Sequence, residues 1–473
     1  MGIARKFLRG VFPLLLAAAL ALGAALPAGA EFNSLLREVP GLTGKSEILL
    51  LLSQDDGSVI FSQNEHLQTA PASLTKLATA ILVLENCADV EAPVTIRREI
   101  FDTYDAANSS NAGLLAGETV SVKDLLYCLL IPSANEAAQA LADYIGGQNQ
   151  TDGTAKENVA RFIAMMNEFA ARVGLENTQF KNAHGLDEPG HYTTAADVAK
   201  ILQYALHPDF AGNRLFEAIC ATREYRLPAT NKHPARNVYS TNHMINPARK
   251  EYYVKGCTGI KTGHTSQAGQ CLTSKAARDG LTYICIVMRG QIAPLEKGGI
   301  DYNTAIYDSK CLLEWCFKYI RYRRVVAQDT IVGELPVALA RDTDHVQLVP
   351  KASLSALVPE GVGSGSVLVE LLPETLAQAL VAPVKEGAAL GQARVLYAGQ
   401  EFARIELVAA EGVQRSASLY LFSLAKRALG NKITHLLLLA ILLVASVYLA
   451  ALLLRARKKR QEKRLRVVAA PKK

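Results

Sequence analysis

The sequence predicts an α+β domain followed by a small all-β domain and one transmembrane helix. Within residues 46–319, strand-like segments stand at both ends and helix-like segments stand between them, which is typical of an antiparallel sheet covered by a helical lobe. Residues 325–413 hold short β-type segments separated by Gly, Pro and Asp. The apolar run 433–454 would extend about 33 Å as a helix, enough to cross a bilayer.

Both ends of the chain carry export or anchoring signals. Residues 1–30 place three basic residues before a short apolar core and end in Ala-Gly-Ala, so we expect a signal peptide and a mature chain beginning near Glu31. Residues 455–473 hold ten Lys or Arg and one Glu, and such basic flanks stay cytoplasmic. Removing the twelve net charges of these two segments from the formal +7 leaves about −5 for residues 31–454. The positive net charge of the whole chain therefore indicates the orientation of the membrane segments, and no nucleic-acid partner is expected.

The first domain begins with a predicted hairpin and ends with three strands and a helix. Asp56-Gly57 is a turn signal between the strand-like runs 46–53 and 58–62. Five helical segments follow, one starting in PASLTKLATA (71–80) and the others at 121–131, 136–145, 159–173 and 194–205. Three strands and an amphipathic helix complete the domain, at 254–262, 269–275, 282–289 and 300–319.

The eight cysteines show neither a dense disulfide framework nor a C-x-x-C pair. Export permits disulfides, but most of the cysteines lie in apolar stretches such as LLYCLL, which favours buried free thiols. A cross-strand pair of Cys257 and Cys271 remains an alternative. No His or Cys spacing predicts a metal site.

Ser73 and Lys76 form an S-x-x-K pattern at the start of the first helix. Side chains at i and i+3 share a helix face, and the unpaired first-turn amides lie beside such a serine. A desolvated lysine could therefore take the serine proton. The alternative is a helix-capping serine with a surface lysine. The second copy, Ser423 to Lys426, stands just before the membrane span beside no other polar cluster, and we interpret it as a chance match.

Two further patterns could complete a site. In GIKTGHTSQAG, Lys261 lies on a predicted strand and Gly263 permits close approach of a substrate backbone. A second cation there would favour the neutral form of Lys76. The alternative is that Lys261 is an edge-strand lysine that discourages aggregation, which would give the same sequence pattern. Ser133 and Asn135 follow a helix stop at a junction between two apolar helices, where they would also serve as helix caps.

The motifs S-x-x-K, S-x-N and K-T-G in this order resemble the active-site-serine penicillin-recognising family, and most closely its low-molecular-weight D-alanyl-D-alanine carboxypeptidases. PASLTK, GIKTGHT and the segment at 180–202 (FKNAHGLDEPGHYTTAADVAKIL) all occur in family order. The resemblance spans residues 40–320 and, more weakly, 325–415. It implies a β-lactamase/transpeptidase-like sheet with a helical lobe, followed by the family's C-terminal β domain. A full membrane span departs from the amphipathic anchor of many members.

The resemblance also implies a chemistry without cofactor or metal. Ser73 would attack the penultimate D-Ala carbonyl of a peptidoglycan stem peptide, with neutral Lys76 as its base, and β-lactams would acylate the same serine. Ser133 would relay a proton to the departing D-Ala. Water would then hydrolyse the acyl-enzyme.

Substrate binding is implied for five residues. Asn135 would hold the substrate amide, and Lys261 with Thr262 would engage the terminal carboxylate beside Gly263. The backbone N–H groups of Ser73 and His264 would form the oxyanion hole.

The chain is expected to have six parts. They are a signal peptide (1–30), a serine D,D-peptidase domain (31–320), a β domain (325–415), a juxtamembrane stalk (416–432), a transmembrane helix (433–454) and a basic cytoplasmic tail (455–473). The catalytic domain would then be extracytoplasmic on a single-pass membrane protein.

Three other functions compete with this interpretation. A class A β-lactamase would need a glutamate in an E-x-x-L-N loop, and the chain has no Leu-Asn dipeptide. A D,D-endopeptidase of the same family would carry the same motifs and stays open at this point. A non-catalytic wall-binding or β-lactam-sensing module is disfavoured by the intact motifs. His184 and His191 are interpreted as structural, because a serine–lysine site needs no imidazole.

Overall fold

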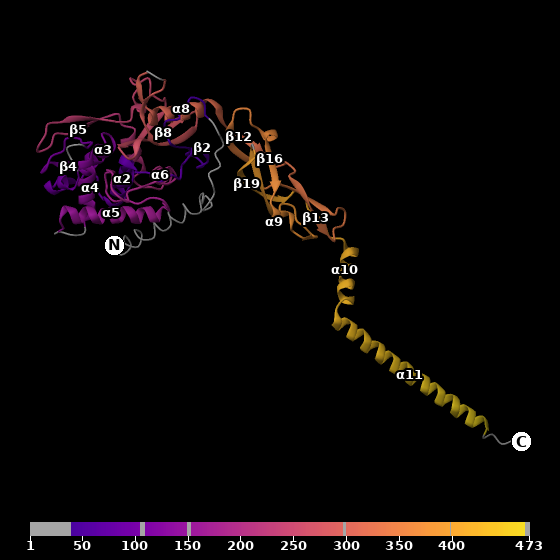
Figure 1. The fold of residues 1–473 in the computed structure, drawn as a ribbon. Coiled ribbons are helices and arrows are strands. Elements are labelled where there is room, and N and C mark those ends of the chain that lie inside the picture. The colour runs from indigo at the N-terminus through magenta and orange to yellow at the C-terminus, as the bar shows by residue number, and fades with distance from the viewer. Residues whose placement is uncertain (1–38, 105–108, 149–152, 297–298, 398, 469–473) are drawn as a thin grey trace. The chain divides into compact units, whose positions relative to one another are not determined.

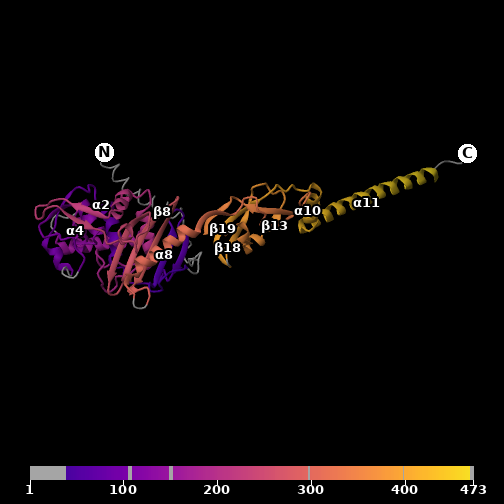
Figure 2. The same cartoon turned by 90° about the horizontal axis from the view of Figure 1, so that it is seen from above.

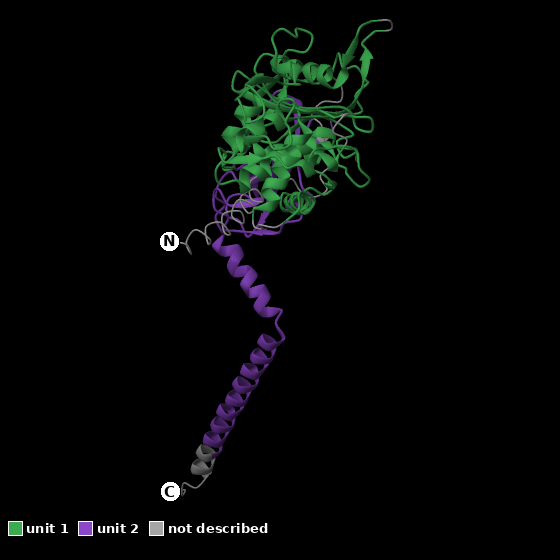
Figure 3. Ribbon diagram, turned by 90° about the vertical axis from the view of Figure 1, so that its left-hand side faces the viewer, with its two compact units in different colours: residues 1–323, 356–362 green, residues 324–355, 363–473 purple. Residues whose placement is uncertain are grey.

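The computed structural model describes residues 39–104, 109–148, 153–296, 299–397 and 399–468. The predicted signal peptide lies outside these residues, as does the end of the predicted tail. The chain forms two compact units, residues 1–323 with 356–362 and residues 324–355 with 363–473 (Figure 1, Figure 3).

The first unit contains the predicted antiparallel sheet, with strand order β2-β1-β9-β8-β7. Its strands are β1 (Ile48–Ser53), β2 (Val59–Gln63), β7 (Cys257–Thr265), β8 (Gly269–Arg278) and β9 (Leu281–Gly290). β1 and β2 form the hairpin predicted from Asp56-Gly57. The α+β prediction is confirmed, and each of the five strands overlaps its predicted range.

The central sheet is buried on both faces. Along β1, Ile48, Leu50 and Leu52 enter one core cluster, whereas Leu49 and Leu51 enter the other. Successive strand side chains point to opposite faces, so this unbroken apolar run supplies both cores. The helical lobe covers the first face, and α8 (Thr304–Tyr319) packs against β8 and β9 on the second (Figure 2).

The helical lobe contains the predicted helices with shifted ends. They are α2 (Thr75–Asn86), α3 (Val122–Leu130), α4 (Asn135–Gly147), α5 (Ala155–Arg172) and α6 (Ala195–Ala205). α5 starts four residues earlier than predicted because Thr154 and Glu157 form a capping box. A further short helix, α7 (Asn213–Cys220), was not predicted.

Short elements lie between these strands and helices along the chain. The strands are β3 (Pro93–Thr95), β4 (Thr119–Ser121), β5 (Glu224–Leu227), β6 (Arg236–Tyr239), β10 (Ile292–Pro294) and β11 (Asp301–Asn303). The 3₁₀ turns are η1 (Ala72–Leu74), η2 (Arg98–Thr103) and η3 (His243–Ile245). Of these, η1 precedes α2 directly and carries Ser73.

The second unit contains the predicted small β domain. Its six-stranded sheet has the order β16-β18-β19-β14-β13-β17. The strands are β13 (Gly333–Ala338), β14 (His345–Pro350), β16 (Val367–Leu371), β17 (Leu380–Val381), β18 (Ala389–Tyr397) and β19 (Gln400–Ala409). The chain enters the second unit within β12 (Ile320–Val326), returns to the first within β15 (Leu354–Pro359) and enters the second again after Val362. The remaining elements are η4 (Ser364–Ser366) and α9 (Pro373–Leu376).

Two helices follow the β domain. The predicted stalk is helical, as α10 (Ala417–Leu429), and the Ser416 hydroxyl accepts a hydrogen bond from Leu419 N at its start. In α11 (Lys432–Val468), the stretch Lys432–Gln461 is long and apolar enough to cross a membrane, with a mean hydropathy of 2.9 and no residue of its most apolar part buried. This stretch fits membrane anchoring and includes the predicted span 433–454.

All eight cysteines are free thiols, as their apolar surroundings predicted. The alternative pair of Cys257 and Cys271 is wrong. Cys257 lies opposite Ala276, and Cys271 lies opposite Gly263, because the β7–β8 turn falls at residues 266–268.

Candidate active site

Ser73 lies on a tight turn whose backbone is unusual. Ala72 has a φ of 49°, in the left-handed region that residues with a Cβ rarely adopt. Neither Ser73 nor its neighbours make a side-chain cap at η1 or α2, so the capping alternative for Ser73 is wrong. The turn instead presents Ser73 at the surface of the lobe while α2 behind it is buried.

Lys76 is fully buried on α2 and makes three short contacts. Its Nζ lies 2.8 Å from Ser73 Oγ, 2.7 Å from Asn135 Oδ1 and 2.6 Å from the backbone oxygen of His184. The structure therefore brings together two of the predicted motifs through one amine. The surface-lysine alternative is wrong.

These contacts orient the amine. Two of its neighbours, Asn135 Oδ1 and His184 O, are carbonyl oxygens that can only accept, so a neutral amine uses both N–H groups on them. The lone pair then points at the Ser73 hydroxyl, which is the arrangement of a base beside its proton donor. Burial, and next the charge of Lys261, hold the pKa of Lys76 well below its ordinary value, while Glu136 opposes them.

The second lysine, Lys261, joins the third motif to Ser133. Its Nζ donates to Ser133 Oγ at 2.8 Å and to Thr262 O at 2.7 Å. β7 is an edge strand, but Lys261 is only 1% exposed. The alternative of a solvent-exposed edge-strand lysine that discourages aggregation is therefore wrong. Burial lowers the pKa of Lys261 to about 7. The expectation that Lys261 favours neutral Lys76 agrees with the lowered pKa of Lys76, although burial lowers that pKa more than the charge of Lys261 does.

Ser133 and Asn135 form the junction between α3 and α4. Ser133 has a φ of 67°, and both side chains are buried. α4 begins after Ala134 without a side-chain cap, so the capping alternative for these two residues is wrong as well. Their side chains bond to the two lysines instead.

The strand β7 passes close to the Ser73 turn. A Cβ placed on Gly263 would lie 3.1 Å from Ser73 N, so only glycine fits without displacing the turn. Thr262 Oγ1 contacts Thr241 Oγ1, and His264 is exposed with Nδ1 3.0 Å from Gln270 Nε2. All eight predicted site residues thus lie on the elements that meet around Ser73 and Lys261.

Three contributors were missed by the sequence motifs. The backbone oxygen of His184 binds Lys76, which no side-chain pattern could reveal. Glu136 is buried beside them and accepts from Ala112 N, and burial raises its pKa. Asp187 accepts from Thr265 Oγ1 and so ties the segment 182–191 to the β7–β8 turn.

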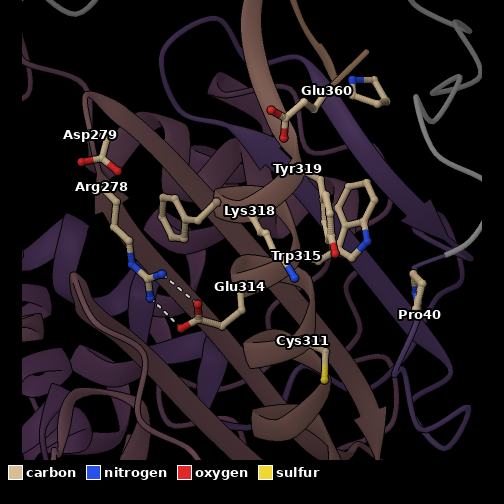
Figure 4. Close-up of a pocket in the computed structure, with 11 residues that line it drawn as sticks. Pro40, Arg278, Asp279, Cys311, Glu314, Trp315, Lys318, Tyr319 and Glu360 are labelled. Carbon is tan, nitrogen blue, oxygen red and sulfur yellow. Dashed lines mark hydrogen bonds and ion pairs between the residues drawn. The ribbon is translucent and has the colours of Figure 1, made fainter. Parts of the chain in front are cut away.

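A separate cavity of about 860 Å³ lies at the second face of the sheet, beside the C-terminal end of α8 (Figure 4). Its lining includes the Arg278–Glu314 ion pair and the rings of Trp315 and Tyr319. Burial raises the pKa of its one thiol, Cys311, to about 11, which makes it a poor nucleophile. Within the described residues, no group of His, Cys, Asp or Glu could hold a metal ion. The catalytic candidate is therefore the serine–lysine cluster.

Comparisons with known proteins agree with one another. A family model described as D-alanyl-D-alanine carboxypeptidase matches residues 37–291, and one described as Penicillin-binding protein 5, C-terminal domain, matches residues 321–415. The chain is 25% identical over 394 residues to D-alanyl-D-alanine carboxypeptidase DacF of Bacillus subtilis (strain 168), covering 82% of this chain and 90% of that one. It is 28% identical over 386 residues to DacC of Escherichia coli (strain K12), covering 80% and 86%. Penicillin binding protein 5 from Haemophilus influenzae superposes with a TM-score of 0.54 at 25% identity, covering 80% and 99%.

Proposed function

The chain belongs to the D-alanyl-D-alanine carboxypeptidase family, and from this premise we propose how its residues carry out the reaction. The enzyme is a serine-type D-Ala-D-Ala carboxypeptidase and a penicillin-binding protein. We propose that its substrates are peptidoglycan stem pentapeptides and that β-lactams acylate it. The observation that carries the residue assignment is the amine of Lys76, whose two N–H groups face carbonyl oxygens while its third contact is Ser73 Oγ.

Acylation would begin with proton transfer from Ser73 Oγ to Lys76 Nζ. Ser73 attacks the carbonyl carbon of the penultimate D-Ala, and the backbone N–H groups of Ser73 and His264 stabilise the oxyanion. Burial and the charge of Lys261 lower the pKa of Lys76 and so favour the neutral amine that this base requires. The resulting tetrahedral intermediate then expels the terminal D-Ala amine.

Ser133 would relay a proton to that amine, and the proton that Lys76 took from Ser73 would replace it on Ser133, so that Lys76 is neutral again before deacylation. Ser133 Oγ accepts from Lys261 Nζ, so its own proton is free to move to the leaving nitrogen. Lys261 and Thr262 would also bind the terminal carboxylate, which the positive charge attracts into a buried site. Asn135 would hold the substrate amide through the part of its side chain not used by Lys76. Water then hydrolyses the acyl-enzyme and restores Ser73.

The remaining parts of the chain would place this enzyme at the wall. We propose an extracytoplasmic catalytic domain, a β domain at 325–415, a stalk and a single span whose basic tail is cytoplasmic. The support is the apolar stretch Lys432–Gln461 and the ten basic residues that follow position 454.

The carboxypeptidase assignment predicts a specific product. Full-length protein in detergent should release free D-Ala from a soluble pentapeptide ending in D-Ala-D-Ala, and none from the same peptide ending in D-Ala-L-Ala. D-Ala measured in a coupled oxidase assay tests this. Cleavage confined to cross-linked muropeptides would establish the disfavoured endopeptidase instead. Covalent penicillin without any peptide cleavage would establish a sensor.

Asn135→Asp should suppress acylation by raising the pKa of Lys76. A carboxylate 2.7 Å from Nζ would favour the ammonium form, which has no lone pair for the Ser73 proton. We expect the acylation rate at neutral pH to fall about 10²-fold or more, the range that general bases contribute, and the acid limb of the pH–rate profile to move to higher pH. Asn135→Ala, which adds no charge, is the control. An unshifted acid limb in Asn135→Asp would contradict the role of Lys76 as base.

A further inference from the structure

The buried imidazole of His191 contacts Thr75, the first residue after the turn that carries Ser73, although none of the proposed steps uses it. His191 is 5% exposed, and its ring packs beside that of Phe180. The residue belongs to the segment 182–191, which also supplies the His184 carbonyl to Lys76. Both ring nitrogens of His191 are hydrogen-bonded, and the ring is shielded from water. The direction of each hydrogen bond can therefore be assigned from His191 to the residues around Ser73.

The tautomer of His191 is fixed by its backbone neighbour. Its Nδ1 lies 2.9 Å from Lys181 N, and an amide N–H can only donate, so Nδ1 accepts. In a neutral ring the proton is then on Nε2. Burial lowers the pKa of His191 to about 4, with Lys181 acting in the same direction and Asp187 opposing, so the ring is neutral at physiological pH.

The Nε2 proton determines where the hydroxyl of Thr75 points. His191 Nε2 lies 2.9 Å from Thr75 Oγ1 and donates to it. The single hydroxyl proton of Thr75 is then directed to the backbone oxygen of Ala72, 2.8 Å away. A directional chain of hydrogen bonds therefore runs from the amide of Lys181 through His191 and Thr75 to the carbonyl that precedes Ser73.

This carbonyl sets the direction of the Ser73 amide. The Ala72–Ser73 peptide is planar and trans, so its oxygen and its N–H point to opposite sides. The carbonyl is also confined by Gly185, where a Cβ would lie 1.9 Å from Ala72 O. Ala72 has a left-handed backbone, which costs free energy and needs outside contacts to persist. On the amide side, Gly263 of β7 packs against Ser73 N.

We propose that His191 is a positioning residue that, through Thr75 and the Ala72 carbonyl, aims the Ser73 N–H into the oxyanion hole. The proposal rests on the proposed role of Ser73 as nucleophile and oxyanion donor. His191 should therefore affect the transition state and not the ground-state binding of substrate. The chain of hydrogen bonds ends at the Ser73 N–H, and the hydrogen bond from this donor to the substrate oxygen strengthens as negative charge develops on that oxygen.

The test compares His191→Phe with His191→Gln. Phenylalanine keeps a ring beside Phe180 and removes both hydrogen bonds, whereas the glutamine amide places an N–H near the former Nε2. Loss of one oxyanion donor costs about 10²–10³-fold in rate, so a misaimed donor should cost about 10-fold or more. We expect this fall in the acylation rate constant of H191F with an unchanged dissociation constant for the penicillin before acylation. H191Q should recover most of the rate. Affinity for phenylboronic acid, whose tetrahedral adduct places an oxygen in the hole, should fall in parallel with the rate.

Thr75 supplies an independent test of the same chain. T75V removes the hydroxyl at nearly equal volume, T75S keeps it, and the double variant H191F/T75V should be no slower than the slower single variant. If H191F does not fold, T75V against T75S decides the question. Wild-type acylation in T75V or in folded H191F, equal defects in H191F and H191Q, or additive defects in the double variant would overturn the proposal. Retained covalent labelling in Ser73→Ala would instead refute the nucleophile assignment, so the two failures are distinguishable.

Discussion

Ser73→Ala should abolish covalent labelling by a fluorescent penicillin and release of D-Ala from the pentapeptide. Among the residues that the structure describes, the variant removes the only oxygen within 2.8 Å of Lys76 Nζ that carries a transferable proton, since the other two contacts are carbonyl oxygens. Nucleophilic catalysis has no alternative route once this atom is absent, so we expect a loss to the detection limit. Gel fluorescence and mass spectrometry of the intact adduct measure it.

The second S-x-x-K copy is the matched control. Ser423 Oγ donates to the backbone oxygen of Tyr420 within α10, and Lys426 is exposed, so neither is prepared for proton transfer. Ser423→Ala should label as the wild type does. Labelling that persists in S73A and disappears in S423A would show that the nucleophile had been assigned to the wrong serine.

Lys76→Met should reduce the acylation rate by about 10²–10⁴-fold, the range that general bases contribute. Methionine fills the buried volume without a titratable nitrogen, so the Ser73 proton has no acceptor. In the wild type, the rate should fall as the pH drops through the lowered pKa of Lys76, because protonation removes the lone pair. K76M should lose this acid limb. Stopped-flow acylation between pH 5 and pH 9 measures both effects.

Lys76→Arg separates base from charge. The guanidinium stays protonated at any usable pH, so it keeps a cation in the site and cannot accept a proton. We expect K76R to be as slow as K76M. Substantial activity in K76R would mean that the positive charge, and not the lone pair, promotes the attack.

The sheet and the motif residues were predictable because local patterns determine them. Ser73 and Lys76 share a face through their i, i+3 spacing, and the apolar runs of β1 and β9 match a sheet that is buried on both faces. Those patterns do not depend on distant residues. The helix starts were less predictable, although the capping box of Thr154 and Glu157 was present in the sequence as a signal for α5.

The parts that escaped prediction depend on backbone geometry. The left-handed conformations of Ala72 and Ser133 run against the preference of residues with a Cβ, so no propensity indicates them. Lys76 binds the backbone carbonyl of His184, and because every residue type has a backbone carbonyl, the sequence gives no signal for this contact. The pairing of Cys271 depended on the position of one hairpin turn, and an error of a few residues there changes every cross-strand partner.

The segment 182–191 has a consequence for how β-lactam binding is inferred from sequence. It places a carbonyl on Lys76, a glycine against Ala72 and an imidazole on Thr75, yet it lies outside the three motifs. With the roles proposed above, we expect a substitution that removes one of these contacts to slow acylation by a β-lactam while S-x-x-K, S-x-N and K-T-G all remain intact. The three motifs alone therefore do not determine how fast such an enzyme reacts with a β-lactam.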